Sequence, residues 1–209
     1  MKEVVLLATA CMLGFVHALE VDHMLAVTTY VSRNPAITAA ARFGARWGIG
    51  HSIAVLAAGG VLLAFGVRWP AHWDAAGEAA VGGMLVVLGV WAILSARRLT
   101  HQAVSDARPT AHAHRGVTLV GFLHGLAGTS AAVALVPITM LDRTAAGLGY
   151  LAAFGLGVTV AMTLFAMVAA VAMRRAADRS RLWSRRAATG VGAAAILTGV
   201  VWMLRAASA

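Results

Sequence analysis

Long apolar stretches separated by short polar segments dominate the chain. Each stretch has about the 20 residues that a helix needs to cross a hydrocarbon core of roughly 30 Å. The pattern predicts six transmembrane helices, over residues 4–31, 47–67, 77–95, 117–141, 147–173 and 187–205. The first stretch continues through polar residues instead of ending at a small-residue cleavage site, so a cleavable signal peptide is not expected.

The composition agrees with a membrane protein. Of the 209 residues, 60% are hydrophobic and 12% are charged, whereas about a quarter are charged in a soluble domain. The net charge of +9 could indicate nucleic acid, but the basic residues form no patch with interleaved aromatic residues, so we expect no nucleic acid partner. Lys2 is the only lysine, which excludes a phosphate-binding Gly-Lys-Ser/Thr loop. Transport would therefore draw on a gradient or on another subunit.

The basic residues predict the topology. Of the 17 lysines and arginines, only four lie on the side of the predicted helices that carries the termini: Lys2, Arg68, Arg143 and Arg205. The other thirteen lie on the opposite side, and loops rich in Lys and Arg stay in the cytoplasm. Both termini are therefore expected to be extracytoplasmic. Four tryptophans near predicted helix ends are expected to be interfacial anchors: Trp47, Trp69, Trp73 and Trp183.

Two halves of the chain resemble each other. An offset of 107 aligns residues 14–19 with 121–126 and residues 48–54 with 155–161, and an offset of 110 aligns 81–90 with 191–200. Three helices in each half predict a 3+3 inverted repeat, a design common among transporters. The repeats would be residues 1–95 and 117–209, with a cytoplasmic histidine-containing loop at 96–116. Chance similarity between Gly/Ala/Val-rich helices is the alternative.

Polar residues within the first predicted helix are the candidate functional site. Glu20 and Asp22 are the only acids well inside a predicted span, where an ionisable side chain is costly and usually functional. His17 and His23 flank them. Imidazole and carboxylate together suit Ni²⁺, Co²⁺, Zn²⁺ or Fe²⁺ better than Mg²⁺ or Ca²⁺. A structural polar network between helices is the alternative.

Helical geometry limits this site. At about 100° per residue, His17, Glu20 and His23 share one stripe, while Asp22 points well away from His17. Either Asp22 faces a neighbouring helix and orients a histidine, or the helix is locally unwound where it lines a cavity.

Two further histidines lie inside predicted spans, and both fall in the repeated segments. His51 follows Gly48 and Gly50, and His124 precedes Gly125. Either is a candidate ligand or a histidine satisfied by tight helix packing. The offset of 107 pairs His51 with Val158, so the halves differ chemically and one site is expected rather than two. His101, His112 and His114 in the loop could hold metal transiently or belong to a solvated linker.

Three motifs resemble a known family. His17-Ala-Leu-Glu-Val-Asp22-His23 resembles the His, four residues, Asp-His motif of the nickel/cobalt transporter family, and Ile49-Gly-His51-Ser52 resembles its Leu-Gly-His-Ser motif. Residues 121–130 are similar to a segment of its shorter nickel-permease-like and urease-accessory-like branch. The resemblance implies secondary transport of Ni²⁺ or Co²⁺ across a bacterial inner membrane, with His17, Asp22, His23 and His51 at motif positions.

These features together predict a gradient-driven permease rather than an enzyme, with the ion as cargo and no resident cofactor. His17 and His23 would be ligands, Asp22 would supply charge or orient a histidine, His51 and His124 would complete the shell, and Glu20 is a further candidate. The lipid bilayer is the expected surrounding, and a second copy of the chain and an accessory metallochaperone are candidate protein partners. The alternatives are a metal-resistance exporter, an intramembrane zinc hydrolase and a non-transporting accessory protein.

Overall fold

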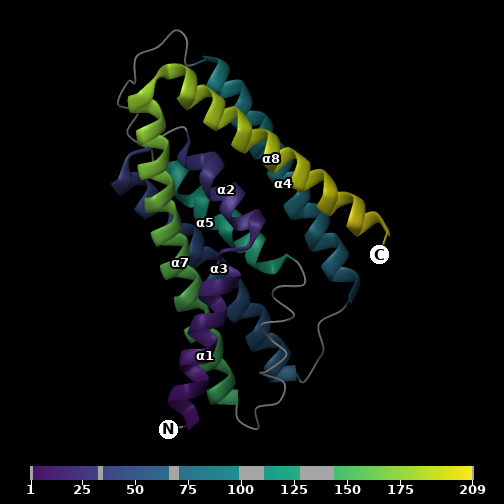
Figure 1. Cartoon of the computed structure of the whole chain (residues 1–209). Coiled ribbons are helices and arrows are strands. Elements are labelled where there is room, and N and C mark those ends of the chain that lie inside the picture. The colour runs from purple at the N-terminus through teal and green to yellow at the C-terminus, as the bar shows by residue number, and fades with distance from the viewer. Residues whose placement is uncertain (1, 33–34, 66–70, 99–110, 128–143, 209) are drawn as a thin grey trace.

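The computed structural model describes residues 2–32, 35–65, 71–98, 111–127 and 144–208, and the regular elements in these ranges are all α-helices. They are α1 (Lys2–His17), α2 (Val21–Val31), α3 (Ile37–Phe65), α4 (Ala71–Arg98), α5 (Ala111–Leu126), α7 (Thr144–Arg179) and α8 (Arg181–Ser208). Helices α1, α3, α5 and α7 form one bundle, and α4 and α8 run side by side next to it (Figure 1). The all-α class predicted from the sequence is confirmed.

The first apolar stretch is a broken helix. Helix α1 ends at His17 and α2 begins at Val21, with a bend of 59° between them. Within the break, the backbone N–H of Leu19 donates to the oxygen of Val16, and that of Glu20 donates to the oxygen of His17, both at 3.0 Å. These bonds satisfy backbone groups that an apolar surrounding would otherwise leave unpaired. The structure has the local unwinding that was one of the two alternatives, and Asp22 also reaches a histidine of a neighbouring helix, as the other alternative expected.

The helices are longer than the apolar pattern predicts. Helix α3 begins at Ile37 rather than near residue 47, and α7 ends at Arg179 rather than near residue 173. The apolar pattern marks only the part of a helix that lies in hydrocarbon, whereas Ala and Arg continue a helix readily into a polar layer.

The predicted loop over 96–116 is also shorter in the structure. Helix α4 continues to Arg98 and α5 begins at Ala111, so His112 and His114 belong to the first turns of α5. His101 lies outside the described residues. So does most of the fourth predicted span, 117–141, beyond residue 127.

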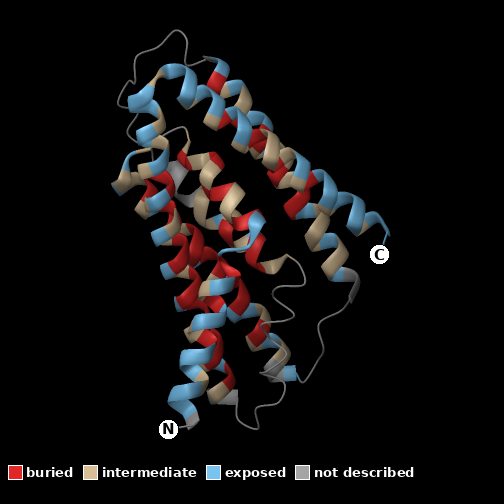
Figure 2. Ribbon diagram, viewed as in Figure 1, coloured by how far each residue is buried: buried red, intermediate tan, exposed pale blue. Residues whose placement is uncertain are grey.

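Several helices are suited to a membrane. Segments Trp73–Arg97, Ala145–Arg179 and Arg181–Ser208 are each long and apolar enough to cross one, and the bent α1–α2 pair is a fourth candidate among the described residues. Figure 2 shows that exposed residues cover the outer faces of the helices. Many of them are large and apolar: Val168 is 66% exposed and Leu197 is 68% exposed. Soluble monomers rarely expose so much apolar surface, so the molecule is a helical membrane protein.

Glycines bring the helices of the bundle into backbone contact. A methyl group at Gly14 on α1 would overlap the backbone oxygen of Phe154 on α7, and one at Gly121 on α5 would overlap the backbone oxygen of Trp47 on α3. Adding 107 to the positions of Gly14 and Trp47 gives Gly121 and Phe154. The α1–α7 and α3–α5 contacts are therefore made by corresponding residues of the two halves.

The same correspondence holds where α3 crosses α7. Gly48 lies against Thr159, and Gly155 lies against Ser52, positions that the offset of 107 exchanges. The Ser52 hydroxyl donates to the backbone oxygen of Gly155 at 2.8 Å, so a hydrogen bond joins the two helices at this point.

Helices α4 and α8 pack through a second glycine pair related by the offset of 110. A methyl group at Gly82 would lie 2.6 Å from the backbone oxygen of Gly199, and one at Gly192 would lie 2.8 Å from that of Gly89. Adding 110 to the positions of Gly82 and Gly89 gives Gly192 and Gly199. The α4–α8 contact is therefore symmetric in itself under this offset.

Candidate metal centre

The break between α1 and α2 turns three polar side chains into the bundle. His17 is the last residue of α1, and Asp22 and His23 lie in the first turn of α2. All three are buried, with exposures of 8%, 3% and 1%. On a continuous helix Asp22 would point away from His17. The 59° bend removes this conflict, so one short segment contributes all three side chains to the same buried region.

Helices α3 and α5 supply the other two candidate residues. Gly125 on α5 approaches the backbone of His51 so closely that a methyl group there would lie 2.6 Å from the His51 oxygen. The two imidazole rings, whose centroids lie 6.1 Å apart, are each only 3% exposed. The glycines beside both histidines thus have a structural role, which is to bring two histidine-bearing helices together.

His23 lies at the centre of the cluster. Its ring centroid is 4.7 Å from that of His17, 5.3 Å from that of His51 and 4.2 Å from that of His124. The structure therefore brings together all four histidines that the sequence places inside predicted spans. They come from three separate parts of the chain: the α1–α2 break, α3 and α5.

Asp22 joins two of these rings. The Nδ1–H of His23 donates to Asp22 Oδ1 at 3.2 Å, and the Nε2–H of His124 donates to Asp22 Oδ2 at 3.1 Å. A carboxylate can only accept, so these bonds fix which nitrogen of each ring carries the proton. The lone pair of His23 is then on Nε2, and that of His124 is on Nδ1. Carboxylates orient metal-binding histidines in the same manner.

Several ring nitrogens have no partner. Among the described residues, His23 Nε2, His124 Nδ1 and both ring nitrogens of His51 are buried without a hydrogen bond. Buried polar atoms are normally paired, and an absent ligand is one reason for an exception. A histidine nitrogen with a free lone pair is an ordinary ligand for a transition metal.

Two groups of side chains have the spacing of a metal site. One consists of His17, His23 and His51, and the other consists of Asp22, His23 and His124. In each group the candidate ligand atoms lie within 4.8 Å of one another. Two nitrogens bound to one ion at about 2.1 Å lie roughly 3.4 Å apart in tetrahedral geometry. The spacing of both groups is close to this value, and His23 belongs to both.

Glu20 lies at the edge of this cluster. Its carboxylate accepts a hydrogen bond from His17 Nδ1 at 2.9 Å, but the side chain is 44% exposed, and it belongs to neither metal-type group. The contact leaves the Nε2 lone pair of His17 for a ligand. Glu20 is therefore placed to orient His17 rather than to share an ion with His23.

Two aromatic rings pack against the cluster, a role that their positions in the sequence do not indicate. Trp47 lies 5.6 Å from His124 between ring centroids, and Phe154 lies 5.5 Å from His17. The expectation that Trp47 is an interfacial anchor is wrong, because it is 2% exposed in the core. Trp73 and Trp183 are 55% and 54% exposed, as anchors should be. The offset of 107 aligns Trp47 with Phe154. The repeat therefore indicates that these two aromatic residues have equivalent positions in the two halves.

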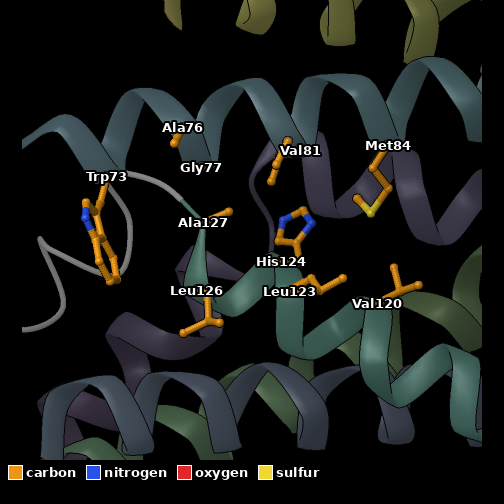
Figure 3. A pocket seen from close by; sticks show the side chains of 11 residues that line it. Trp73, Ala76, Gly77, Val81, Met84, Val120, Leu123, His124, Leu126 and Ala127 are labelled. Atoms are coloured by element: carbon orange, nitrogen blue, oxygen red, sulfur yellow. The ribbon is translucent and has the colours of Figure 1, made fainter. Parts of the chain in front are cut away.

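An apolar cavity reaches the cluster from one side. It lies between α4 and α5 and has a volume of about 520 Å³. Figure 3 shows the His124 ring pointing from α5 toward Val81 and Met84 on α4, with Trp73 at the far end. His124 is the one residue of the cluster that lines this cavity. It therefore stands between Asp22 and a space large enough for a small ligand.

Comparison with known proteins identifies a relative. The chain is 31% identical over 188 residues to the urease accessory protein UreH of Bacillus sp. (strain TB-90), and the matched region covers 85% of this chain and 81% of the relative. No family model and no solved structure matches. The identity extends over nearly the whole of both chains, far beyond the three motifs of the sequence. This chain therefore belongs to the same family as the urease accessory protein UreH.

Proposed function

We propose that this protein is a membrane permease for a divalent transition-metal ion, and that the ion passes through the cluster of His17, Asp22, His23, His51 and His124. The observation that carries the proposal is the set of buried ring nitrogens without partners, supplied by three separate parts of the chain around one carboxylate. A purely structural network would pair its polar atoms.

The donor set suits a first-row divalent transition metal, and the family resemblance favours Ni²⁺ or Co²⁺ among these as cargo. Four imidazoles and one carboxylate suit the later first-row divalent metals, while Mg²⁺ and Ca²⁺ prefer oxygen ligands. Helix α1 also ends at the cluster, so the negative end of its dipole points at a bound cation. The relative's name adds support, since the motifs of this chain resemble the urease-accessory-like branch of the nickel/cobalt transporter family.

The two ligand groups supply a path for the ion. His23 is common to both groups, so an ion held by His17, His23 and His51 can move to Asp22, His23 and His124 without losing every ligand. The second position requires that the ring protons accepted by Asp22 leave, because a protonated nitrogen cannot bind the ion. The apolar cavity reaches the second group at His124. Exchange between neighbouring positions keeps the barrier low, because conduction requires binding that is weak enough to release the ion.

Alternating access would come from an inverted repeat. The matched contacts Gly14–Phe154 and Gly121–Trp47 support two related halves, residues 1–95 and 117–209, with six crossings in all. Helices α3 and α7 cross at the point that the offset maps onto itself, and two such halves can rock about a shared site. The arginine bias puts both termini outside the cytoplasm of a bacterial inner membrane.

Uptake of radioactive nickel or cobalt by expressing cells tests the proposal. His17→Ala and Asp22→Asn, compared at equal protein level, should abolish the uptake that the natural chain confers. Asp178→Asn is the matched control, because this acid is exposed at the far end of α7. Unchanged uptake in the first two variants would refute the site.

The direction of the metal signal separates the alternatives. A fall in cellular metal on expression would mean export through the same site. Purified protein that retains zinc through chelation and gives no flux in liposomes would instead favour an intramembrane hydrolase, because a catalytic zinc stays in place.

A further inference from the structure

The corner between α7 and α8 carries a dense group of arginines that the metal site does not use. Six arginines lie between residues 174 and 186, and all are exposed: Arg174, Arg175, Arg179, Arg181, Arg185 and Arg186. Only one acid, Asp178, lies among them. The positive-inside pattern explains the side of the membrane on which they lie, but not how they are arranged in space.

Two of these arginines line a hollow. Four lining residues of α7 lie on one helix face, at i, i+3, i+4 and i+7: Ala172, Arg175, Ala176 and Arg179. Trp183 of α8 lines the hollow as well. The hollow has a volume of about 700 Å³. The two alanines leave space between the longer side chains. Both guanidinium groups therefore border one space of the size of a lipid headgroup.

One residue joins the two helices that border the hollow. Ser180 is the only residue between α7 and α8. Its hydroxyl accepts a hydrogen bond from the backbone N–H of Trp183 at 3.2 Å, and its backbone oxygen accepts one from Ser184 at 3.1 Å. Ser180 thus caps the start of α8. Figure 1 shows the sharp corner that results, at the end of α7 away from the N-terminus.

We expect the corner to lie in the headgroup layer of the membrane. Helix α7 has 36 residues, or about 54 Å at 1.5 Å per residue, so it is longer than a hydrocarbon core of about 30 Å. Val168 is 66% exposed and marks the apolar part of the helix, and Arg175 follows two turns later. Leu182 and Trp183, each 54% exposed, place apolar surface beside the arginines. This mixture is typical of a lipid interface.

The charge of the hollow fits a phosphate group. Neither Arg175 nor Arg179 has a hydrogen-bond or ion-pair partner in the described part of the chain, and Asp178 leaves the lining with a net charge of about +1. Guanidinium groups bind phosphate through paired hydrogen bonds. A phosphodiester with one negative charge would match this lining, while Trp183 would lie against the glycerol and the upper acyl chain.

We propose that the hollow at the α7–α8 corner binds the phosphate headgroup of one anionic phospholipid, held by Arg175 and Arg179. Clusters of basic residues next to a membrane helix attract anionic lipid. The hollow differs from such a cluster in binding one lipid at one place. This site is independent of the metal cluster, which lies near the other end of α7.

Native mass spectrometry of the full chain, titrated with phosphatidylglycerol or phosphatidylcholine in detergent, tests the proposal. We expect one retained phosphatidylglycerol per chain and weak binding of phosphatidylcholine. The double variant R175Q/R179Q should lose about 10- to 30-fold in affinity for phosphatidylglycerol. The double variant R174Q/R186Q removes the same charge outside the hollow and should change the affinity less than about threefold. Lysine at 175 and 179 should restore part of the binding.

Several results would overturn this site. Equal losses in the two double variants would mean diffuse surface attraction. Equal affinity for the two lipids would remove the role of the headgroup charge. Displacement of phosphatidylglycerol by millimolar inorganic phosphate would identify a soluble anion as the ligand.

The control for folding is the melting temperature of each variant. Melting temperatures of all variants within a few degrees of the natural chain would exclude unfolding as the cause of lost binding.

Discussion

Replacing Asp22 by asparagine removes one charge from the centre of the cluster while keeping the shape of the side chain. Asp22 is 3% exposed and accepts hydrogen bonds from His23 at 3.2 Å and from His124 at 3.1 Å. Asparagine has only one acceptor oxygen, and its NH₂ group would face the N–H of the other ring. That histidine must then either lose its hydrogen bond or move its proton to the other ring nitrogen. In the second case the lone pair faces the asparagine and is no longer on the nitrogen that would bind the metal.

The size of the effect follows from this loss. A hydrogen bond to a charged group contributes about 1.5–3 kcal/mol, and a loss of that size corresponds to roughly 10- to 150-fold in affinity. Equilibrium dialysis of Ni²⁺ or Co²⁺ with purified protein measures it directly. Glu20→Gln is the matched control, because Glu20 is 44% exposed and its bond to His17 is partly screened by solvent. We expect less than about a threefold change there.

If Asp22→Asn binds metal within about twofold of the natural chain, the carboxylate neither orients the histidines nor contributes charge to the ion, and the reasoning fails. The same holds if Glu20→Gln weakens binding as strongly as Asp22→Asn. A variant that no longer folds would show a changed melting temperature, so the dialysis is compared only among variants that melt alike.

Three further predictions concern packing around the site, each checked by the midpoint of thermal unfolding in detergent. Gly157→Ala should destabilise by about 1–3 kcal/mol, because its methyl group would overlap the backbone of Cys11; Gly83→Ala, with open space around it, should be neutral or stabilising. Trp47→Ala should cost about 3–5 kcal/mol and weaken metal binding, since the 2% exposed ring packs on His124. Ser52→Ala should cost about 1 kcal/mol by removing the α3–α7 hydrogen bond. Equal midpoints for Gly157→Ala and Gly83→Ala, or no loss for Trp47→Ala or Ser52→Ala, would contradict these contacts.

The sequence predicts much of this site because charge in hydrocarbon is costly. That cost selects Glu20, Asp22 and the four intramembrane histidines from the chain, and of these the structure leaves Glu20 at the edge of the cluster. The spacing of Asp22 and His17 on a helix also predicts that an unbroken helix cannot direct both at one place, and the structure has the break at residues 18–20. Residue types and helical period are therefore sufficient to find the cluster and its main constraint.

Tertiary packing decides what the sequence leaves open. Trp47 lies near a predicted helix end, and only the longer α3 and its contact with His124 show that it is a core residue. The apolar pattern also does not predict the helix ends. Helix α7 ends at Arg179 and α8 begins at Arg181, in a segment whose residues suit either a helix or a loop. The partners of Asp22 depend on the approach of α5, which sequence spacing does not encode.

Flux of Ni²⁺ or Co²⁺ into liposomes that contain only the purified protein tests the central proposal most directly. The ion is added outside, and a metal-sensitive dye inside reports its entry. We expect flux with the natural chain, and loss of flux with His23→Ala, since this ring belongs to both ligand groups. Absence of flux with the natural chain, or equal flux with His23→Ala, would contradict transport through this cluster.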